Sequence, residues 1–307
     1  MLDLDTFLTT VYVLADEFCQ TRPPERRPGP APSLCRSEVL TLALVSQWGR
    51  FPSERAFYRF AQRHLRAAFP TLPDRSQFNR LLRHHQASLA AFALTVTAAL
   101  SAAPPAYEVL DTVPLPTRTQ HRRGRGWLAG IANVGRSLRL GWFTGLRLLV
   151  AVAPTGAITG FGLGPASAND RHLAETLFAL RQHPDPALPR VGQDAAGAYL
   201  ADTGFGGYQI VAHWQTTYGA LVLCPPQRGS HRVWSRRERR QISGRRQIVE
   251  TVVAKLLDTF RLRTERPHTL SGLLARLAAK VALHNVCLRL NQQLDRPLLA
   301  FADLIDW

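Results

Sequence analysis

Three acidic residues stand in settings that favour metal-ion chemistry. Asp111 ends the apolar run 107–111, Asp202 follows a short apolar run and precedes Thr-Gly-Phe-Gly-Gly, and Glu250 lies within a strongly helical pattern. Hard divalent cations prefer oxygen ligands, and phosphodiester chemistry commonly uses two such ions about 3.5–4 Å apart. Carboxylates on two strands and one helix could supply both ions. The order therefore predicts a magnesium site formed by Asp111, Asp202 and Glu250.

The segments around these carboxylates resemble the DDE transposases of bacterial insertion sequences. The three blocks are Leu110–Pro116, Ala201–Phe205 and Arg246-x-x-x-Glu250, in the family's order. Any one block is a weak signal, but the ordered set is specific, and the resemblance covers about residues 107–292. Between the first two blocks, segments 145–152, 157–161 and 165–172 are similar to the family's second strand, third strand and following turn.

The resemblance implies an α/β fold with a ribonuclease-H-like mixed sheet flanked by helices. It implies an endonuclease reaction in which water attacks a phosphodiester at the end of the insertion sequence. The 3′-hydroxyl that this cleavage frees then attacks target DNA. Asp111, Asp202 and Glu250 would ligate two Mg²⁺ ions, for which Mn²⁺ could substitute. The implied partners are double-stranded DNA at the element ends and the target, with a homodimer in the DNA complex. A nuclease without strand transfer and an inactive or regulatory DNA-binding remnant remain alternatives.

The third block departs from the family's pattern. The family usually has a Tyr three residues before the Arg and a Lys seven after the Glu, where this chain has Ser243 and Leu257. On a continuous helix, Arg261 would return to within about 20° of the Glu250 face, and Arg246 lies one turn before Glu250. We therefore expect Arg246 and Arg261 to contact phosphates beside the metal site.

The charge balance indicates a nucleic-acid partner independently of the family. The chain has 38 Lys and Arg against 22 Asp and Glu, a formal net charge of +16. Such an excess is the electrostatic footprint of phosphate binding. Ribosomal and histone-like proteins are also basic, but 46% hydrophobic residues suffice for a sizeable buried core.

The densest basic run, residues 228–246, lies between the last predicted strand and Glu250. Like-charge blocks are often solvated tails, but this one is internal, and we expect a basic insertion at 225–246 that lies over DNA. Trp234 could stack on an unpaired base or pack against the protein, and the sequence leaves both open. The expected phosphate contacts are Arg236, Arg237, Arg239 and Arg240.

Residues 1–103 are predicted to form an all-α, helix-turn-helix-like DNA-binding region with a Pro-rich linker at 21–34. Ser37, Ser53 and Asp74 are predicted helix caps, and the apolar stretch 88–103 is too short to span a bilayer, so it reads as a buried helix. A solvated helical face is the alternative to DNA binding. The outward arginines of this region are Arg50, Arg55, Arg59, Arg63, Arg66, Arg75, Arg80 and Arg83.

Residues 104–307 are predicted to form the catalytic domain. Asp170 and Asp194 are rivals to Asp202, but Asp170 sits at a predicted helix cap and Asp194 precedes its strand. No phosphate-binding Gly-rich loop and no basic leader occur, so we expect no nucleotide cofactor, no membrane association, and a cytoplasmic protein that joins the nucleoid when bound to DNA. The predicted strands are 107–111, 145–153, 157–162, 198–202, 208–212 and 219–224. One helix is predicted to begin near Asn169, and two more are predicted at 245–262 and 269–294.

Overall fold

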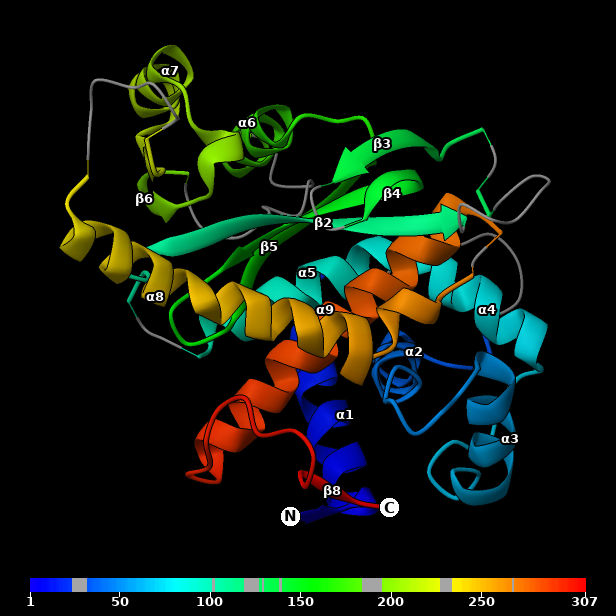
Figure 1. Cartoon of the computed structure of the whole chain (residues 1–307). Helices are drawn as coiled ribbons and strands as arrows, with labels where there is room; N and C mark the ends of the chain where they lie inside the picture. Colours follow the sequence, from blue (N-terminus) through cyan, green and yellow to red (C-terminus); the bar gives the residue numbers. More distant parts are fainter. Residues whose placement is uncertain are drawn as a thin grey trace. The chain divides into compact units, whose positions relative to one another are not determined.

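The chain divides into two compact units in the computed structural model. The helical unit comprises Met1–Val96, Leu256–Glu265 and Thr269–Trp307, and the sheet unit comprises Thr97–Lys255 and Arg266–His268. Figure 1 shows the elements of both. The structure describes residues 1–23, 32–100, 103–118, 127–128, 130–137, 140–183, 195–226, 234–266 and 268–307.

The first helices of the helical unit begin where the sequence offers oxygen atoms as caps. Asp3, Ser53 and Asp74 each accept a hydrogen bond from a first-turn amide, which satisfies a donor that has no partner within the helix. The prediction that Ser37 caps a helix is wrong. The cap position of α2 is Cys35, and the Ser37 hydroxyl donates to Asp16 at 2.7 Å. These helices are α1 Leu4–Gln20, α2 Arg36–Val45, α3 Glu54–His64, α4 Arg75–His84 and α5 Gln86–Ala98.

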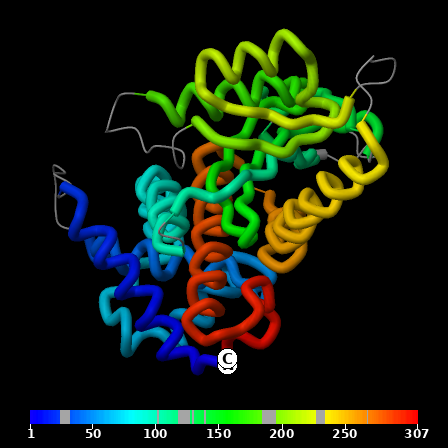
Figure 2. Tube along the Cα trace, turned by 90° about the vertical axis from the view of Figure 1, so that its left-hand side faces the viewer, coloured from blue at the N-terminus to red at the C-terminus, as the bar shows by residue number. Residues whose placement is uncertain are grey.

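The last helix, α9 (Leu270–Gln293), is the centre of the helical unit. Its side chains are buried almost continuously from Ala275 to Leu290, and it contacts α2 and α4 (Figure 2). A helix that is buried on every side belongs in a core. By its contacts, the segment after residue 255 therefore belongs mostly with residues 1–96. A short parallel pair, β1 (Leu2–Asp3) with β8 (Ile305–Asp306), also joins the two ends of the chain.

A buried polar network ties α9 to the helices around it. The Lys280 ammonium donates to the Gln47 side chain at 2.8 Å and to the Phe260 carbonyl at 2.6 Å, and it pairs with Glu265 at 2.9 Å. Burial alone would raise the pKa of Glu265, but Lys280 and Arg276 hold it below its usual range. The charged and polar side chains of this network, Lys280, Gln47 and Glu265, thus all have partners, as burial requires.

The sheet unit is a mixed sheet with the strand order β3-β4-β2-β6-β7, in which β5 also pairs with β4. The pairs among β2, β3, β4 and β5 are antiparallel, whereas β2–β6 and β6–β7 are parallel. The helices α6 and α7 contact each other, and α8 contacts β2 and β4 (Figure 1). The elements are β2 Glu108–Arg118, β3 Asn133–Ser137, β4 Gly141–Val152, β5 Ile158–Pro165, α6 Asp170–Arg181, β6 Gly197–Leu200, α7 Tyr208–Tyr218, β7 Ala220–Leu223 and α8 Arg236–Ala254.

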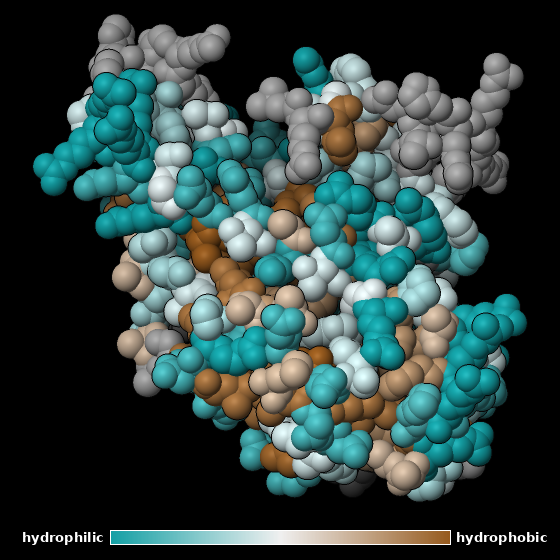
Figure 3. All heavy atoms as spheres, turned by 60° about the horizontal axis from the view of Figure 1, so that its bottom comes forward, coloured by the Kyte–Doolittle hydropathy of each residue, from teal (hydrophilic) through white to brown (hydrophobic). Residues whose placement is uncertain are grey.

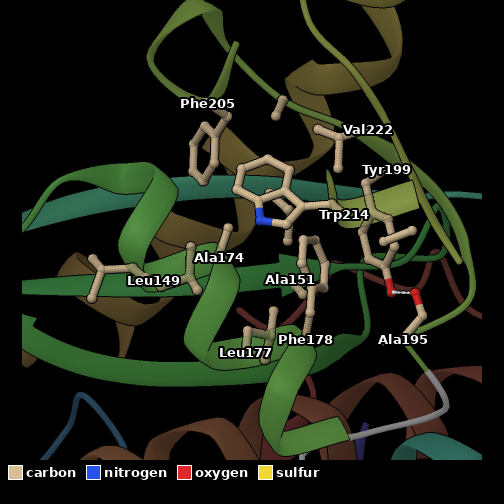
Figure 4. Packing of buried hydrophobic residues seen from close by; sticks show 14 residues of the cluster. Leu149, Ala151, Ala174, Leu177, Phe178, Ala195, Tyr199, Phe205, Trp214 and Val222 are labelled. Atoms are coloured by element: carbon tan, nitrogen blue, oxygen red, sulfur yellow. Dashed lines mark hydrogen bonds between the residues drawn. The ribbon is translucent and has the colours of Figure 1, made fainter. Parts of the chain in front are cut away.

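The hydrophobic core of this unit lies between the sheet and the pair α6–α7. Phe178 from α6 packs against Trp214 from α7 and Tyr199 from β6, with ring centroids 5.4 and 4.9 Å away (Figure 4). Leu149 and Ala151 of β4 belong to the same cluster. Large aromatic side chains bury much apolar surface, and these rings therefore hold α6 and α7 against the sheet.

A buried ion pair lies beside this core, and its hydrogen bonds join four elements. The Arg181 guanidinium donates to both Glu108 carboxylate oxygens, at 2.9 and 2.8 Å, and to the Tyr199 hydroxyl at 2.8 Å. The Thr159 hydroxyl also donates to Glu108. Arg181 is 1% exposed, so the pair is desolvated and its geometry must be satisfied throughout.

Several sequence-based boundaries are wrong in informative ways. Residues 208–212, predicted as a strand, begin α7. The predicted basic insertion at 225–246 ends in a helix, because Ser235 and Glu238 form a reciprocal capping box that starts α8 at Arg236. That helix ends at Ala254, before a five-residue π turn (Lys255–Thr259), and not at 262 as predicted. The strand β3 was not predicted, and Asp194 lies outside the described residues.

Removing one partner of the buried pair should destabilise the protein strongly. We expect Arg181→Met to lower the free energy of unfolding by about 3–5 kcal/mol, because the Glu108 charge is left buried without its partner. The double variant Glu108→Gln/Arg181→Met should recover part of the loss. Urea unfolding followed by circular dichroism measures both, and a single variant as stable as the wild type would contradict the role given to this pair.

Candidate functional site

Asp111 is held on β2 in a largely buried setting. The Thr112 amide donates to its carboxylate at 2.9 Å. Burial raises the pKa of Asp111 to about 6; the Thr112 hydrogen bond and Arg246 oppose this shift, and the charges of Asp202 and Asp170 add to it. The carboxylate therefore lies among other acids in an environment that disfavours its charged form.

The register of the sheet brings Asp202 beside Asp111. In the parallel pair β2–β6, Glu108 lies opposite Tyr199 and Val109 opposite Leu200, and each aspartate follows its paired residue by two positions. Asp202 accepts a hydrogen bond from the Gly204 amide at 2.8 Å and caps the short 3-10 turn Thr203–Phe205, whose Phe205 is fully buried. The turn is thus anchored and aims its carboxylate at a fixed place.

Asp170 is a third acidic neighbour of this pair and not a substitute for Asp202. It accepts a hydrogen bond from the Thr112 hydroxyl at 2.7 Å and pairs with Arg147 at 2.6 Å. A Cβ atom built at Gly204 would lie 2.7 Å from Asp170 and 3.0 Å from Asp202. The sequence prediction of a helix cap was right, since Asn169 caps α6, but it did not bring Asp170 to the site. The unusual Asn-Asp pair was the available signal.

The helix α8 contributes Arg246 to the site, whereas Glu250 is exposed one turn further on. Arg246 is half-buried and close enough to Asp111 and to Cys224 to lower the pKa of both. Among the described residues, no three acidic, histidine or cysteine side chains are grouped so as to hold a metal ion. From the predicted set, the structure thus brings together Asp111, Asp202 and Arg246, with Asp170 as a further acidic neighbour, whereas Glu250 is exposed.

The continuous helical spacing that predicted Arg261 on the Glu250 face does not hold. Because α8 ends at Ala254, the helical spacing does not reach Arg261, which belongs to the helical unit and donates to the Pro52 carbonyl at 3.3 Å. Its backbone adopts the left-handed conformation, with φ +60°.

The four arginines predicted to contact phosphate lie on the exposed first turns of α8. Arg236, Arg237, Arg239 and Arg240 are exposed, and Trp234, just before the helix, is half-buried. Hydrophilic side chains gather at the left edge of the face in Figure 3, where α8 begins. Both interpretations of Trp234 stay open.

The thiol of Cys224 lies close enough to Asp202, Arg246 and Arg171 for their charges to shift its pKa. Burial raises the pKa of the Cys224 thiol to about 12; Asp202 also raises this pKa, whereas Arg246 and Arg171 lower it. A pKa this high keeps the thiol protonated at neutral pH. Its surroundings place two guanidinium groups, those of Arg246 and Arg171, around the acidic residues.

The predicted family is confirmed by comparison with known proteins. Residues 109–286 match the model of the transposase DDE domain. This match covers more than half of the chain, which therefore belongs to the transposase DDE domain family. The mixed sheet flanked by helices is consistent with the predicted ribonuclease-H-like fold. None of the curated proteins compared with the chain matches it. No helix in the described part of the chain is long and apolar enough to cross a bilayer.

The pKa of Asp111 predicts a pH-dependent stability. Folding raises this pKa from its usual 3.8 to about 6, so in metal-free buffer the wild type should lose stability as the pH rises through that window. Asp111→Asn removes this loss, and at pH 7 the variant should be more stable by up to about 3 kcal/mol. Urea unfolding in EDTA at pH 4, 5, 6 and 7 measures the difference. The control is Asp303→Asn at an exposed position, and a difference that is constant with pH would refute the assignment.

Proposed function

We propose that this protein is a DNA transposase that cleaves DNA at the ends of an insertion sequence and joins the freed 3′-hydroxyl to target DNA. The observation that carries the proposal is the β2–β6 register, in which Asp111 and Asp202 each lie two positions after the pair Val109–Leu200. Membership of the transposase DDE domain family supports the reaction class. The arginines beside the aspartates suit a phosphate substrate.

The aspartates fit a divalent cation by their chemistry. Both offer carboxylate oxygens, the ligands that Mg²⁺ and Mn²⁺ prefer, and a cation would relieve the repulsion that contributes to the raised pKa of Asp111. Asp111 and Asp202 would hold the metal, and Glu250 would complete the site from α8. Bound metal ions supply activation of the attacking oxygen and stabilisation of the leaving one. Arg246 would contact the phosphate, and the protein's own part is to position it.

DNA binding is the proposed role of the two basic surfaces. In the helical unit, Arg50, Arg55, Arg59, Arg63, Arg66, Arg75 and Arg80 are exposed and Arg83 is half-buried. We assign this surface to the element ends and the basic first turns of α8 to the DNA near the site. Joining two ends to a target calls for a homodimer in the DNA complex, acting at the bacterial nucleoid.

A catalytically inactive DNA-binding remnant is the second candidate. The exposure of Glu250 and the replacement of the family's Tyr and Lys by Ser243 and Leu257 favour it. An assay with labelled end DNA and Mg²⁺ or Mn²⁺ separates the candidates. Joined products indicate a transposase, cleavage alone a nuclease without strand transfer, and binding alone the remnant.

Loss of one carboxylate should separate catalysis from binding. We expect Asp111→Ala, Asp202→Ala and Glu250→Gln each to reduce DNA cleavage by at least roughly 100-fold, because each removes a metal ligand. Affinity for end DNA should stay within several-fold, since many arginines share the phosphate contacts. Glu17→Gln, at an exposed position on α1, is the control. A Glu250→Gln protein that cleaves at the wild-type rate would remove Glu250 from the site.

The basic first turns of α8 predict a salt effect that is separable from stacking. Replacing Arg236, Arg237, Arg239 and Arg240 with Ala should lower the slope of log affinity against log salt by at most about four, because each phosphate contact contributes about 0.9. Trp234→Ala should leave this slope unchanged, since the ring carries no charge. Fluorescence anisotropy from 50 to 200 mM salt measures both. An unchanged slope in the quadruple variant would show that these turns do not contact phosphate.

A further inference from the structure

The most exposed large side chain with hydrophobic character among the described residues lies close to the candidate site. Tyr208 is 92% exposed and begins α7, six residues after Asp202. An aromatic ring that folding leaves almost wholly in water gains little from burial, so its position suggests contact with something outside the chain.

The link between Tyr208 and Asp202 is rigid. Phe205 is fully buried in the core, the Gly206 amide donates to the Thr203 carbonyl at 3.1 Å, and Asp202 caps the turn. Gly207, directly before Tyr208, has φ +150°, a conformation that a side chain rarely adopts. The turn thus sets where α7 and the Tyr208 backbone begin after Asp202.

A guanidinium group lies against the same turn. A Cβ atom built at Gly207 would lie 3.5 Å from the central carbon of the Arg171 guanidinium. Tyr208 directly follows Gly207, and consecutive Cα atoms are about 3.8 Å apart. The Arg171 guanidinium therefore lies beside the residue next to Tyr208. Within the described part of the chain, the Arg171 guanidinium has no hydrogen-bond or ion-pair partner, and its buried Nε atom is unsatisfied.

The charge of Arg171 reaches the site itself. It acts on Cys224, which also feels Asp202 and Arg246. Two guanidinium groups therefore act on the thiol next to Asp202, Arg246 from α8 and Arg171 from α6. A planar cation against Gly207 and an exposed aromatic ring on the next residue match the two parts of a nucleotide, its phosphate and its base.

We propose that Tyr208 and Arg171 form a subsite for one unpaired nucleotide of the DNA strand beside Asp202, with the base stacked on the Tyr208 ring and a phosphate on the Arg171 guanidinium. This inference rests on the proposed DNA substrate. Inside a duplex the faces of a base are already stacked on their neighbours, so the subsite takes a nucleotide at a strand end or one turned out of the helix.

The test uses the full-length protein in EDTA and a duplex with a four-nucleotide single-stranded extension that carries 2-aminopurine. Binding of the wild type should quench the 2-aminopurine fluorescence, because stacking on an aromatic ring quenches it. We expect Tyr208→Ala to lose most of the quenching and, by anisotropy, to bind roughly 5- to 150-fold more weakly, the loss that corresponds to one stacking contact. Tyr208→Phe keeps the ring and should keep the quenching.

The phosphate contact has its own readout. Arg171→Gln should lower the slope of log affinity against log salt by about 0.7–0.9, the contribution of one contact. Tyr208→Ala should leave that slope unchanged. Gln209→Ala, at the exposed neighbouring position on α7, is the control for local disturbance and should behave like the wild type.

The outcomes separate this inference from the proposed function. A wild type that does not bind the duplex would overturn both. Salt-dependent binding with full quenching in Tyr208→Ala would overturn the subsite alone. A change from dimer to monomer in Tyr208→Ala, measured by sedimentation without DNA, would assign the ring to an interface between copies and would also overturn the subsite.

Discussion

The parallel pairing of β2 with β6 is the constraint on which the site depends. Only two residue pairs define the register, Glu108 with Tyr199 and Val109 with Leu200. A slip by one residue would turn every side chain of the strand to the other face and would separate the two aspartates. The buried Arg181 opposes such a slip because it bonds Glu108 and Tyr199, the first paired residues, at the same time. Glu108 and Tyr199 each lie three residues before one of the aspartates. Through its bonds to both, Arg181 thus holds the register that brings Asp111 and Asp202 together.

The charges around Asp111 follow from where the strands end. β2 continues past Asp111 in an antiparallel pairing with β4, while β6 stops at Leu200 and the chain turns. That turn has room for Asp170 and Asp202 together only because Gly204 has no side chain. The acids are crowded and partly desolvated, and Arg147 and Arg246 offset part of their charge. Such a balance is typical of a place where a cation or a phosphate binds.

Much of this was predictable from the sequence, because local signals for strands and caps were strong. The apolar runs before Asp111 and Asp202 identified both aspartates, and Asn169 identified the start of α6. The rest depended on tertiary contacts. The predicted position of Arg261 assumed that α8 continued, but the helix ends in a π turn. The capping box at Ser235 and Glu238 is a local signal for the start of α8, which the sequence prediction did not use. Asp170 could not be assigned, because Thr112 and Arg147 approach it from distant parts of the chain.

The place of α9 in the helical unit bears on how the protein folds during synthesis. Its partners α2 and α4 leave the ribosome early, but residues 99–269 come before α9 begins. Synthesis from the end of α2 at Val45 to the start of α9 at Leu270 takes roughly 11–45 s at about 5–20 residues per second, and the apolar side chains of α2 lack the covering helix during this time. The sheet unit is nearly continuous in sequence and can form in that interval. The nascent chain therefore passes through a stage in which a structured sheet follows an unfinished helical segment, a state that chaperones are suited to protect.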